Sequence, residues 1–243
     1  MGGQQAFHWG VMFPDFVKRA VGICTSSRTS GHNYAFLEGP IAALTNSIDY
    51  IAWSQIKAKK AAGEVVEGPL NEVKPIHGLQ AFGRTYSAWL TSAEWFHEKK
   101  WKSLGFQNVE SWIKTQGETK PDWDANDLLV LARMWQMGDI STVDNGSDGS
   151  NPTLSQLGGG EGDDEAWKLA LKSITAKVLL LPCKTDQYFR PQANLEEARY
   201  LQCGDVEVIE SIWGHIAGGG ASEEDTSFMN RKLADFMVGE ASR

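Results

Sequence analysis

Two polar side chains that could act together in catalysis each follow a predicted strand. Asp186 lies just after the apolar run 177–181, and His215 lies just after the run 206–210. Both runs have the composition of short buried strands in a parallel sheet. Because loops at the carboxyl ends of parallel strands surround the ligand crevice, we expect Asp186 and His215 to lie at the same edge. There the acid would orient the histidine as a general base.

Each of the two residues also has a simpler interpretation. Asp186 is equally suited to cap the helix that begins near Pro191. His215 stands between Gly214 and the glycine run 218–220, which is typical of a surface turn. Their order favours the catalytic interpretation, because an acid and then a histidine downstream of a glycine-rich helix start reproduces the chain order Ser…Asp…His.

The opening run of the chain, MGGQQAF at residues 1–7, is similar to the second half of a nucleophile elbow. In such an elbow, glycines after the serine allow a strand and the following helix to approach closely. The serine would then belong immediately before Met1. Cys24, Ser26 and Ser27 end a predicted strand, but none of them lies on a glycine-flanked turn before a helix. None is therefore favoured as a replacement nucleophile, and Cys24 is better explained as a small buried apolar residue.

The elements that must position these residues alternate between strands and helices. The apolar patterns predict strands at 20–24, 177–181 and 206–210, and helices at 4–12, 192–201 and 223–237. This order points to an α/β fold with a parallel sheet. The middle of the chain shows no convincing strand, and its predicted helices are 41–60, 81–100 and 124–137.

We therefore divide the chain into four parts. They are a nucleophile helix with the strand after it (1–28), a helical lid (29–143), a flexible connection rich in Gly, Ser, Asp and Asn (144–165), and a C-terminal core with the acid and histidine loops (166–243). Arg28 and Asn33 come just after the first strand, where they could contact a carboxylate or an acyl group of a substrate. Hydrogen bonding within the loop and lid is the simpler explanation of both.

Composition excludes several classes of protein. A net charge of −8 argues against a nucleic-acid partner, and no stretch approaches the roughly 18 apolar residues that a membrane span needs. The three cysteines, Cys24, Cys183 and Cys203, have no CxxC spacing, so neither a disulfide framework nor a zinc site is predicted. We expect no bound metal, and a cytoplasmic, reducing location.

The catalytic segments and several others resemble one protein family. The chain resembles the homoserine O-acetyltransferase-related group of α/β-hydrolase-fold proteins, entered just after the nucleophile serine. The resemblance covers nearly the whole chain and is carried by residues 1–6 (the family's Ser-Met-Gly-Gly-x-Gln elbow continuation), 13–21, 123–128 (a lid motif), 181–189 and 211–215. It implies an α/β-hydrolase fold with an incomplete parallel sheet and a helical lid insertion.

The resemblance also implies roles for individual residues. Asp186 would be the triad acid, His215 the general base, and the backbone N–H of Met1 an oxyanion-hole donor. The activity would be acyl transfer or ester hydrolysis on a small-molecule ester or hydroxyl substrate. Acetyl-CoA or another acyl-CoA would be the acyl donor of a transferase, with no cofactor held permanently. The resemblance also allows a homodimer through the lid.

Two further interpretations stay open from the sequence. The chain could be a catalytically inactive remnant that acts as a scaffold or interaction module, or one part of a split enzyme completed by a separate chain. Without the nucleophile strand, the run 20–24 would form an unpaired sheet edge, which is an aggregation hazard. We therefore expect the chain by itself to fold poorly or to depend on a partner.

Overall fold

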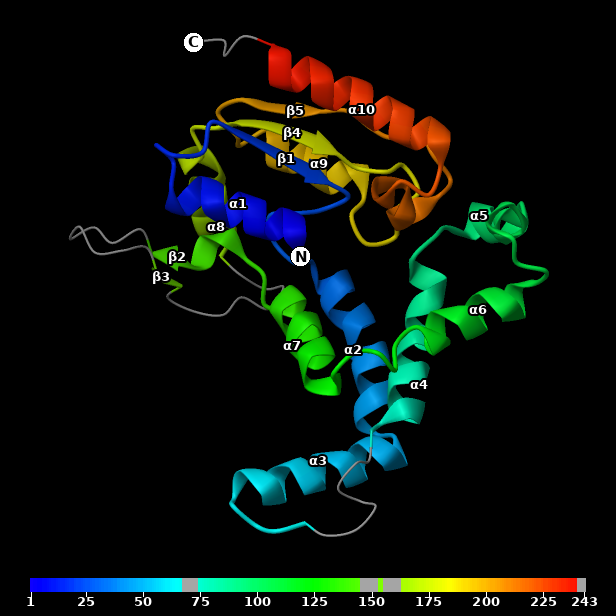
Figure 1. The fold of residues 1–243 in the computed structure, drawn as a ribbon. Helices are drawn as coiled ribbons and strands as arrows, with labels where there is room; N and C mark the ends of the chain where they lie inside the picture. The colour runs from blue at the N-terminus through cyan, green and yellow to red at the C-terminus, as the bar shows by residue number, and fades with distance from the viewer. Residues whose placement is uncertain (67–73, 145–152, 155–162, 240–243) are drawn as a thin grey trace. The chain divides into compact units, whose positions relative to one another are not determined.

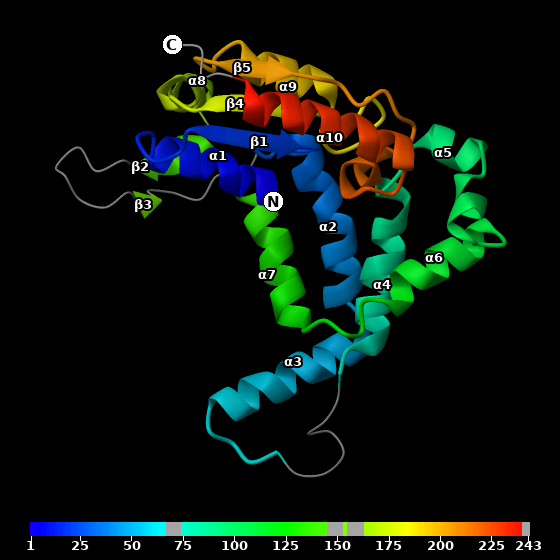
Figure 2. The ribbon, with the colours of Figure 1, turned by 45° about the horizontal axis from the view of Figure 1, so that its top comes forward.

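The computed structural model describes residues 1–66, 74–144, 153–154 and 163–239 of the chain. They fall into two compact units (Figure 1, Figure 2). The core unit comprises residues 1–34, 89–98 and 134–243, and the helical unit comprises residues 35–88 and 99–133.

A three-stranded parallel sheet forms the centre of the core unit. Its strands are β1 (Arg19–Ile23), β4 (Lys177–Leu181) and β5 (Gly204–Val206), in the order β1-β4-β5. They lie side by side in Figure 1. The parallel register brings the carboxyl ends of all three strands to one edge, and the segments that contain Asp186 and His215 leave the sheet there.

Alternate side chains of β4 pack against different helices because successive residues of a strand point to opposite faces. Val178 and Leu180 are buried with residues of α1 (Gly2–Met12) and α8 (Asp164–Ser173). Leu179 and Leu181 are buried with residues of η5 (Gly214–Gly219) and α10 (Glu223–Val238) on the other face. Burying a side chain of this size contributes roughly 1.5–3 kcal/mol to the free energy of folding. Packing on both faces therefore stabilises the sheet.

The remaining elements of the core unit surround this sheet. They are α5 (Ala93–His97), η4 (Ile140–Thr142), β2 (Val143–Asp144), β3 (Thr153–Leu154), α9 (Pro191–Ala198), η5 (Gly214–Gly219) and α10 (Glu223–Val238). Two helices, α2 (Gly31–Thr45) and α7 (Ala125–Gln136), have residues in both units.

The helical unit has its own apolar core. It contains α3 (Ile48–Ala61), α4 (Ile76–Tyr86), η3 (Lys100–Leu104), α6 (Val109–Glu118) and most of α2 and α7, with η2 (Ser87–Trp89) at its boundary. Leu44, Trp53, Leu79 and Phe82 are buried together. Across the described residues, no helix combines the length and the hydropathy needed to cross a bilayer.

The structure corrects some predicted element boundaries. The predicted strand 206–210 is wrong in its extent, because β5 begins at Gly204 and ends at Val206, after which only Ile209 forms an isolated bridge, with Cys183. The predicted helix 41–60 is two helices, since Ser47 caps the start of α3 by accepting a hydrogen bond from the Tyr50 N–H.

The predicted connection 144–165 is described only in part. Residues 145–152 and 155–162 lie outside the described residues, whereas 143–144 and 153–154 form a short antiparallel pair. Helix α8 already begins at Asp164. The predicted lid function of residues 29–143 stays a prediction.

Candidate active site

Asp186 and His215 form a hydrogen-bonded pair at the carboxyl edge of the sheet. His215 Nδ1 lies 2.9 Å from Asp186 Oδ2. The Asp186 side chain is fully buried, while 32% of the His215 side chain is exposed. Because an ionised carboxylate can only accept hydrogen bonds, Nδ1 carries the proton and the Nε2 lone pair is left to accept another. The sequence-predicted pair is thus brought together in the geometry of an acid that orients a histidine.

The loop after β4 fixes the carboxylate through its other oxygen. Asp186 Oδ1 accepts hydrogen bonds from the backbone N–H groups of Tyr188 (2.7 Å) and Phe189 (3.2 Å). The alternative role as a cap of α9 is wrong, because Arg190 occupies that cap position and no side chain caps the helix. Asp186 instead closes its own turn with one oxygen and holds His215 with the other.

A glycine and a hydroxyl set the position of the histidine loop. Gly214 has φ +62°, and a Cβ there would lie 2.6 Å from the Thr91 backbone. Its N–H donates to Thr185 Oγ1 at 3.2 Å, and the Thr185 hydroxyl in turn donates to the Ser211 carbonyl at 2.9 Å. The loops after β4 and β5 are therefore tied directly together beside the Asp186–His215 pair.

Two aromatic rings from the acid loop flank the imidazole. The Tyr188 ring lies edge-on to His215 with centroids 5.0 Å apart, and the Phe189 centroid lies at 5.6 Å. Both aromatic side chains are buried. Their place two and three residues after Asp186 puts them beside the base, a contact that no sequence pattern indicated.

Cys24 lies beside the Asp186–His215 pair, which the sequence did not indicate. It is the residue after β1, is 4% exposed, and lines a cavity of about 480 Å³ together with His215 and Gly218. Burial, then the negative charge of Asp186, raises the pKa of its thiol. Its φ of +45° places a non-glycine residue in the left-handed region, which costs about 1–2 kcal/mol. The prediction of a small buried residue is confirmed, but its position at the end of β1 also brings it to the candidate site.

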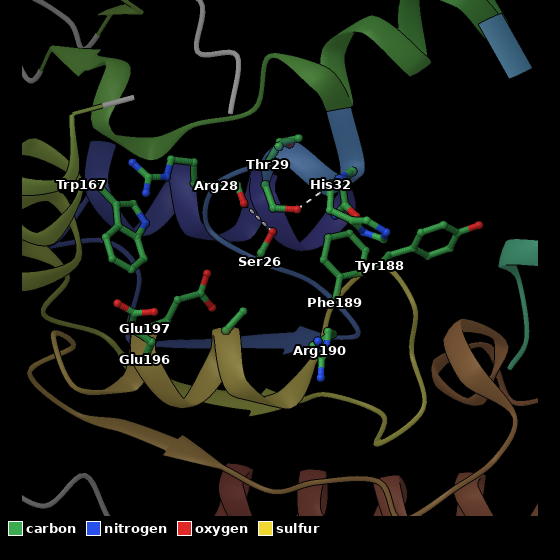
Figure 3. A pocket seen from close by; sticks show the side chains of 14 residues that line it. Ser26, Arg28, Thr29, His32, Trp167, Tyr188, Phe189, Arg190, Glu196 and Glu197 are labelled. Carbon is green, nitrogen blue, oxygen red and sulfur yellow. Dashed lines mark hydrogen bonds between the residues drawn. The ribbon is translucent and has the colours of Figure 1, made fainter. Parts of the chain in front are cut away.

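Arg28 and Asn33 line a second cavity, of about 610 Å³, shown in Figure 3. The Arg28 guanidinium pairs with Asp164 at 2.6 Å and stacks over the Trp167 ring at 4.9 Å. Asn33 is 1% exposed, and its Oδ1 is buried without a hydrogen-bond partner among the residues that the structure describes. Tyr188 and Phe189 line this cavity as well, so the aromatic side chains beside His215 also border the cavity of the two predicted substrate-binding residues.

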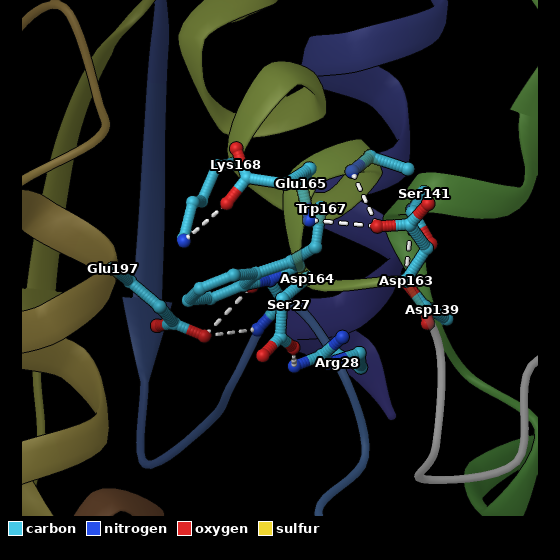
Figure 4. Close-up of polar contacts among 11 residues, drawn as sticks. Ser27, Arg28, Asp139, Ser141, Asp163, Asp164, Glu165, Trp167, Lys168 and Glu197 are labelled. Atoms are coloured by element: carbon cyan, nitrogen blue, oxygen red, sulfur yellow. Dashed lines mark hydrogen bonds and ion pairs between the residues drawn. The ribbon is translucent and has the colours of Figure 1, made fainter.

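A buried carboxyl that the sequence analysis missed anchors the segment after β1. Glu197 Oε1 accepts hydrogen bonds from the Ser27 N–H (2.6 Å) and hydroxyl (2.8 Å), as Figure 4 shows. Asn194 Nδ2 donates to the other oxygen at 2.6 Å, and Trp167 Nε1 donates to Ser27 Oγ at 2.8 Å. Burial raises the pKa of Glu197 to about 7, although the hydrogen bonds from Ser27 and Asn194 act in the opposite direction.

Met1 lines a different cavity from the one that Cys24 and His215 share. It is the N-cap residue of α1, and its carbonyl accepts a hydrogen bond from the Gln5 N–H at 3.1 Å. It lines a third cavity, of about 500 Å³, with Gln4, His8 and Trp9 among other residues. Within the described residues, His215 is therefore hydrogen-bonded to Asp186, and Arg28 and Asn33 line one cavity, whereas Met1 lines another.

Comparison with known proteins finds similarity to ester hydrolases and to homoserine acyltransferases. No family model matches the chain. It is 27% identical over 244 residues to an ethyl acetate hydrolase of Pseudomonas veronii, covering 99% of this chain and 60% of that protein. It is 25% identical over 231 residues to a homoserine O-succinyltransferase of Hydrogenovibrio crunogenus, covering 89% and 52%.

Solved structures show the same fold. The acetyl esterase MekB superposes with a TM-score of 0.73 at 25% identity, covering 98% of this chain and 60% of that one. The homoserine O-acetyltransferase of Bacillus anthracis superposes with a TM-score of 0.66 at 22% identity, covering 99% and 58%. The chain thus spans about 60% of the length of MekB and of the Pseudomonas veronii hydrolase.

The parallel sheet and the fold of these relatives point to the same fold class. The predicted fold class, an α/β-hydrolase fold with an incomplete sheet, is confirmed by them. The chain has the α/β-hydrolase fold and is similar to esterases and homoserine O-acetyltransferases of that superfamily.

Proposed function

We propose that this chain supplies the acid and the general base of a serine-dependent acyl-transfer site. The observation that carries the proposal is the 2.9 Å contact between His215 Nδ1 and the buried Asp186 carboxylate. In this role His215 Nε2 takes the proton of an attacking hydroxyl and returns it to the leaving group. Asp186 keeps the ring in the required tautomer and stabilises the imidazolium.

Asp186 and His215 supply the acid and the base, and the proposed mechanism also needs an attacking serine. Within the described parts of the chain, no hydroxyl forms a hydrogen bond with His215. Its place in the proposal is the position immediately before Met1, as the elbow-like run 1–7 suggests. The backbone nitrogen of Met1 is then a proposed oxyanion donor, which would lower the barrier by stabilising the tetrahedral intermediate.

The substrate is proposed at the level of a small ester or hydroxyl compound. The names of the relatives include ethyl acetate and homoserine as substrates, with acetyl and succinyl groups transferred. An acyl-CoA would be the donor in a transferase, and water the acceptor in a hydrolase. Arg28 and Asn33 are proposed substrate contacts, since a guanidinium recognises carboxylates well and the buried Asn33 Oδ1 has no hydrogen-bond partner in the described part of the chain.

The test completes the site and measures turnover. We would fuse the part of the Pseudomonas veronii relative that precedes the matching region to residue 1, and assay p-nitrophenyl acetate hydrolysis and transfer from acetyl-CoA to homoserine. We expect turnover by the fusion and none by the chain alone, because only the fusion contains a nucleophile. His215→Ala should abolish that turnover. His97→Ala is the matched control, since His97 is an exposed histidine of the core unit.

The inactive-remnant alternative predicts a different result. A fusion that folds, judged by a cooperative thermal transition, and yet turns over neither substrate would favour a scaffold or interaction role. A fusion whose activity survives His215→Ala would contradict the assignment of the base. The proposed homodimer through the lid is tested separately by light scattering of the fusion.

A further inference from the structure

We propose that Cys24, Asp186 and His215 together form a binding site for a zinc-type divalent metal ion. One ligand atom from each residue, the Cys24 sulfur, an Asp186 oxygen and a His215 ring nitrogen, lies within 4.8 Å of the other two. The three residues come from the ends of three different segments at the carboxyl edge of the sheet, far apart in the sequence. Spacing rules for metal motifs therefore could not indicate the site.

The donor set is one that zinc uses. Thiolate sulfur, imidazole nitrogen and carboxylate oxygen are its ordinary protein ligands, with bond lengths of about 2.3 Å to sulfur and about 2.0–2.2 Å to nitrogen and oxygen. Tetrahedral coordination then needs ligand separations of about 3.3–3.6 Å. The histidine nitrogen and the aspartate oxygen are 2.9 Å apart and would separate by about 0.4 Å on binding the metal. The Cys24 sulfur lies within 4.8 Å of both and would move closer by up to about 1.3 Å.

The surroundings fix the positions of two of the three ligands. The Cys24 sulfur donates a hydrogen bond to the Leu181 carbonyl at 3.9 Å. Gly218 leaves room for this sulfur, because a Cβ at position 218 would lie 2.9 Å from it. The second Asp186 oxygen is held by two backbone N–H groups of its own loop. Such outer contacts orient ligands and are a normal part of a metal site.

The site also has room for the fourth ligand. Cys24 and His215 both line the cavity of about 480 Å³, which leaves space for a water molecule on the metal. Three protein ligands and one water are the usual arrangement of an open zinc site.

The binding step balances with the loss of one proton. The Cys24 thiol loses its proton to solvent and binds as thiolate, the carboxylate binds as it is, and the neutral imidazole binds through a nitrogen lone pair. If the metal takes Nδ1, the ring proton moves to Nε2 and none is lost from the histidine. A metal at this site would occupy the residues that the proposed function uses as acid and base, so metal binding and acyl transfer would exclude each other; this consequence alone rests on the proposed function.

The test uses Co²⁺ as an optical substitute for Zn²⁺ on the full chain. A cysteine thiolate bound to Co²⁺ gives a near-ultraviolet charge-transfer band, which Zn²⁺ should remove by displacement. We expect the band in the unaltered chain and in Cys203→Ala, whose cysteine is half-buried and outside the cluster. We expect no band in Cys24→Ser, with affinity at least about tenfold weaker. A band that persists in Cys24→Ser, or no band in the unaltered chain, would overturn the site.

A second measurement does not depend on the folding of a variant. In the unaltered chain, Zn²⁺ should slow the alkylation of Cys24 by iodoacetamide and leave that of Cys203 unchanged, as followed by peptide mass spectrometry. Equal rates for Cys24 with and without Zn²⁺ would contradict the proposal. Neither readout needs ester turnover, so a failed metal site leaves the proposed acyl-transfer function standing.

Discussion

At the scale of single residues, two buried carboxyl groups are held in different ways. Asp186 shares its oxygens between its own loop and His215, whereas Glu197 accepts all its hydrogen bonds from the segment after β1 and from α9. Burial raises the pKa of Glu197 from 4.5 to about 7. Its pKa in the folded protein is thus above that in the unfolded chain, and the folded state binds more protons between these values. The free energy of unfolding therefore falls as pH rises from about 4.5 to about 7.

Glu197→Gln should remove this part of the pH dependence, because an amide does not titrate. In the unaltered chain, the Glu197 contribution to stability is fully present below about pH 4.5 and is lost by about pH 7, a change on the order of 3 kcal/mol. Urea unfolding at pH 5 and pH 7 of both proteins measures it. Glu64→Gln is the control, since that side chain is exposed and lies in the helical unit. Parallel pH profiles for the unaltered chain and Glu197→Gln would show that the buried carboxyl does not titrate in this range.

The sequence indicated the acid and the histidine but not the groups that surround them. Asp186 and His215 could be predicted because each directly follows an apolar run, and parallel strands bring such positions together. Cys24 follows a strand in the same way, yet its spacing from the other two carries no signal. Glu197 looked like any helix-surface glutamate, because its burial depends on the packing of α9 against the segment after β1.

At the scale of elements, the glycine at the start of η5 determines where the histidine lies. In Gly214→Ala, an alanine would have to adopt the φ of +62° that Gly214 has. Its Cβ would lie 2.6 Å from the Thr91 backbone. We expect a loss of about 1–3 kcal/mol of stability from the strained backbone, with more from the clash, and a displaced His215. Thermal unfolding measures the first effect and turnover of the fusion measures the second. Gly219→Ala in the same short helix is the matched control, since a Cβ there has no atom within 4 Å. Equal melting temperatures for the two variants would contradict this account.

The element boundaries show where apolar patterns are informative. Strands β1 and β4 were predicted to within a residue, because their continuous apolar runs are typical of buried parallel strands. The run 206–210 predicted too long a strand, since Val206 and Val208 are only partly buried and only Ile209 of this run is fully buried. The helix break at Ser47 was missed because its capping hydroxyl is a local signal inside an otherwise helical stretch.

At the scale of the whole molecule, β1 has a strand on one side only among the described strands of its sheet. Unpaired strand edges promote association with other chains. We expect the chain by itself to self-associate in a concentration-dependent way, as measured by light scattering after gel filtration, and the fusion to do so less. Association through the lid would instead persist in the fusion. A chain that stays monomeric and melts cooperatively at all concentrations would contradict this expectation.

The most direct test of the central claim is the turnover of acetate ester by the fusion with Asp186→Asn. Asparagine keeps the shape of the side chain but cannot hold His215 in the required tautomer or stabilise the imidazolium. The account predicts that kcat falls by about 10³- to 10⁴-fold while the melting temperature changes little. A kcat within about tenfold of the unaltered fusion, well short of that loss, would contradict the pairing of Asp186 with His215 as the catalytic acid and base.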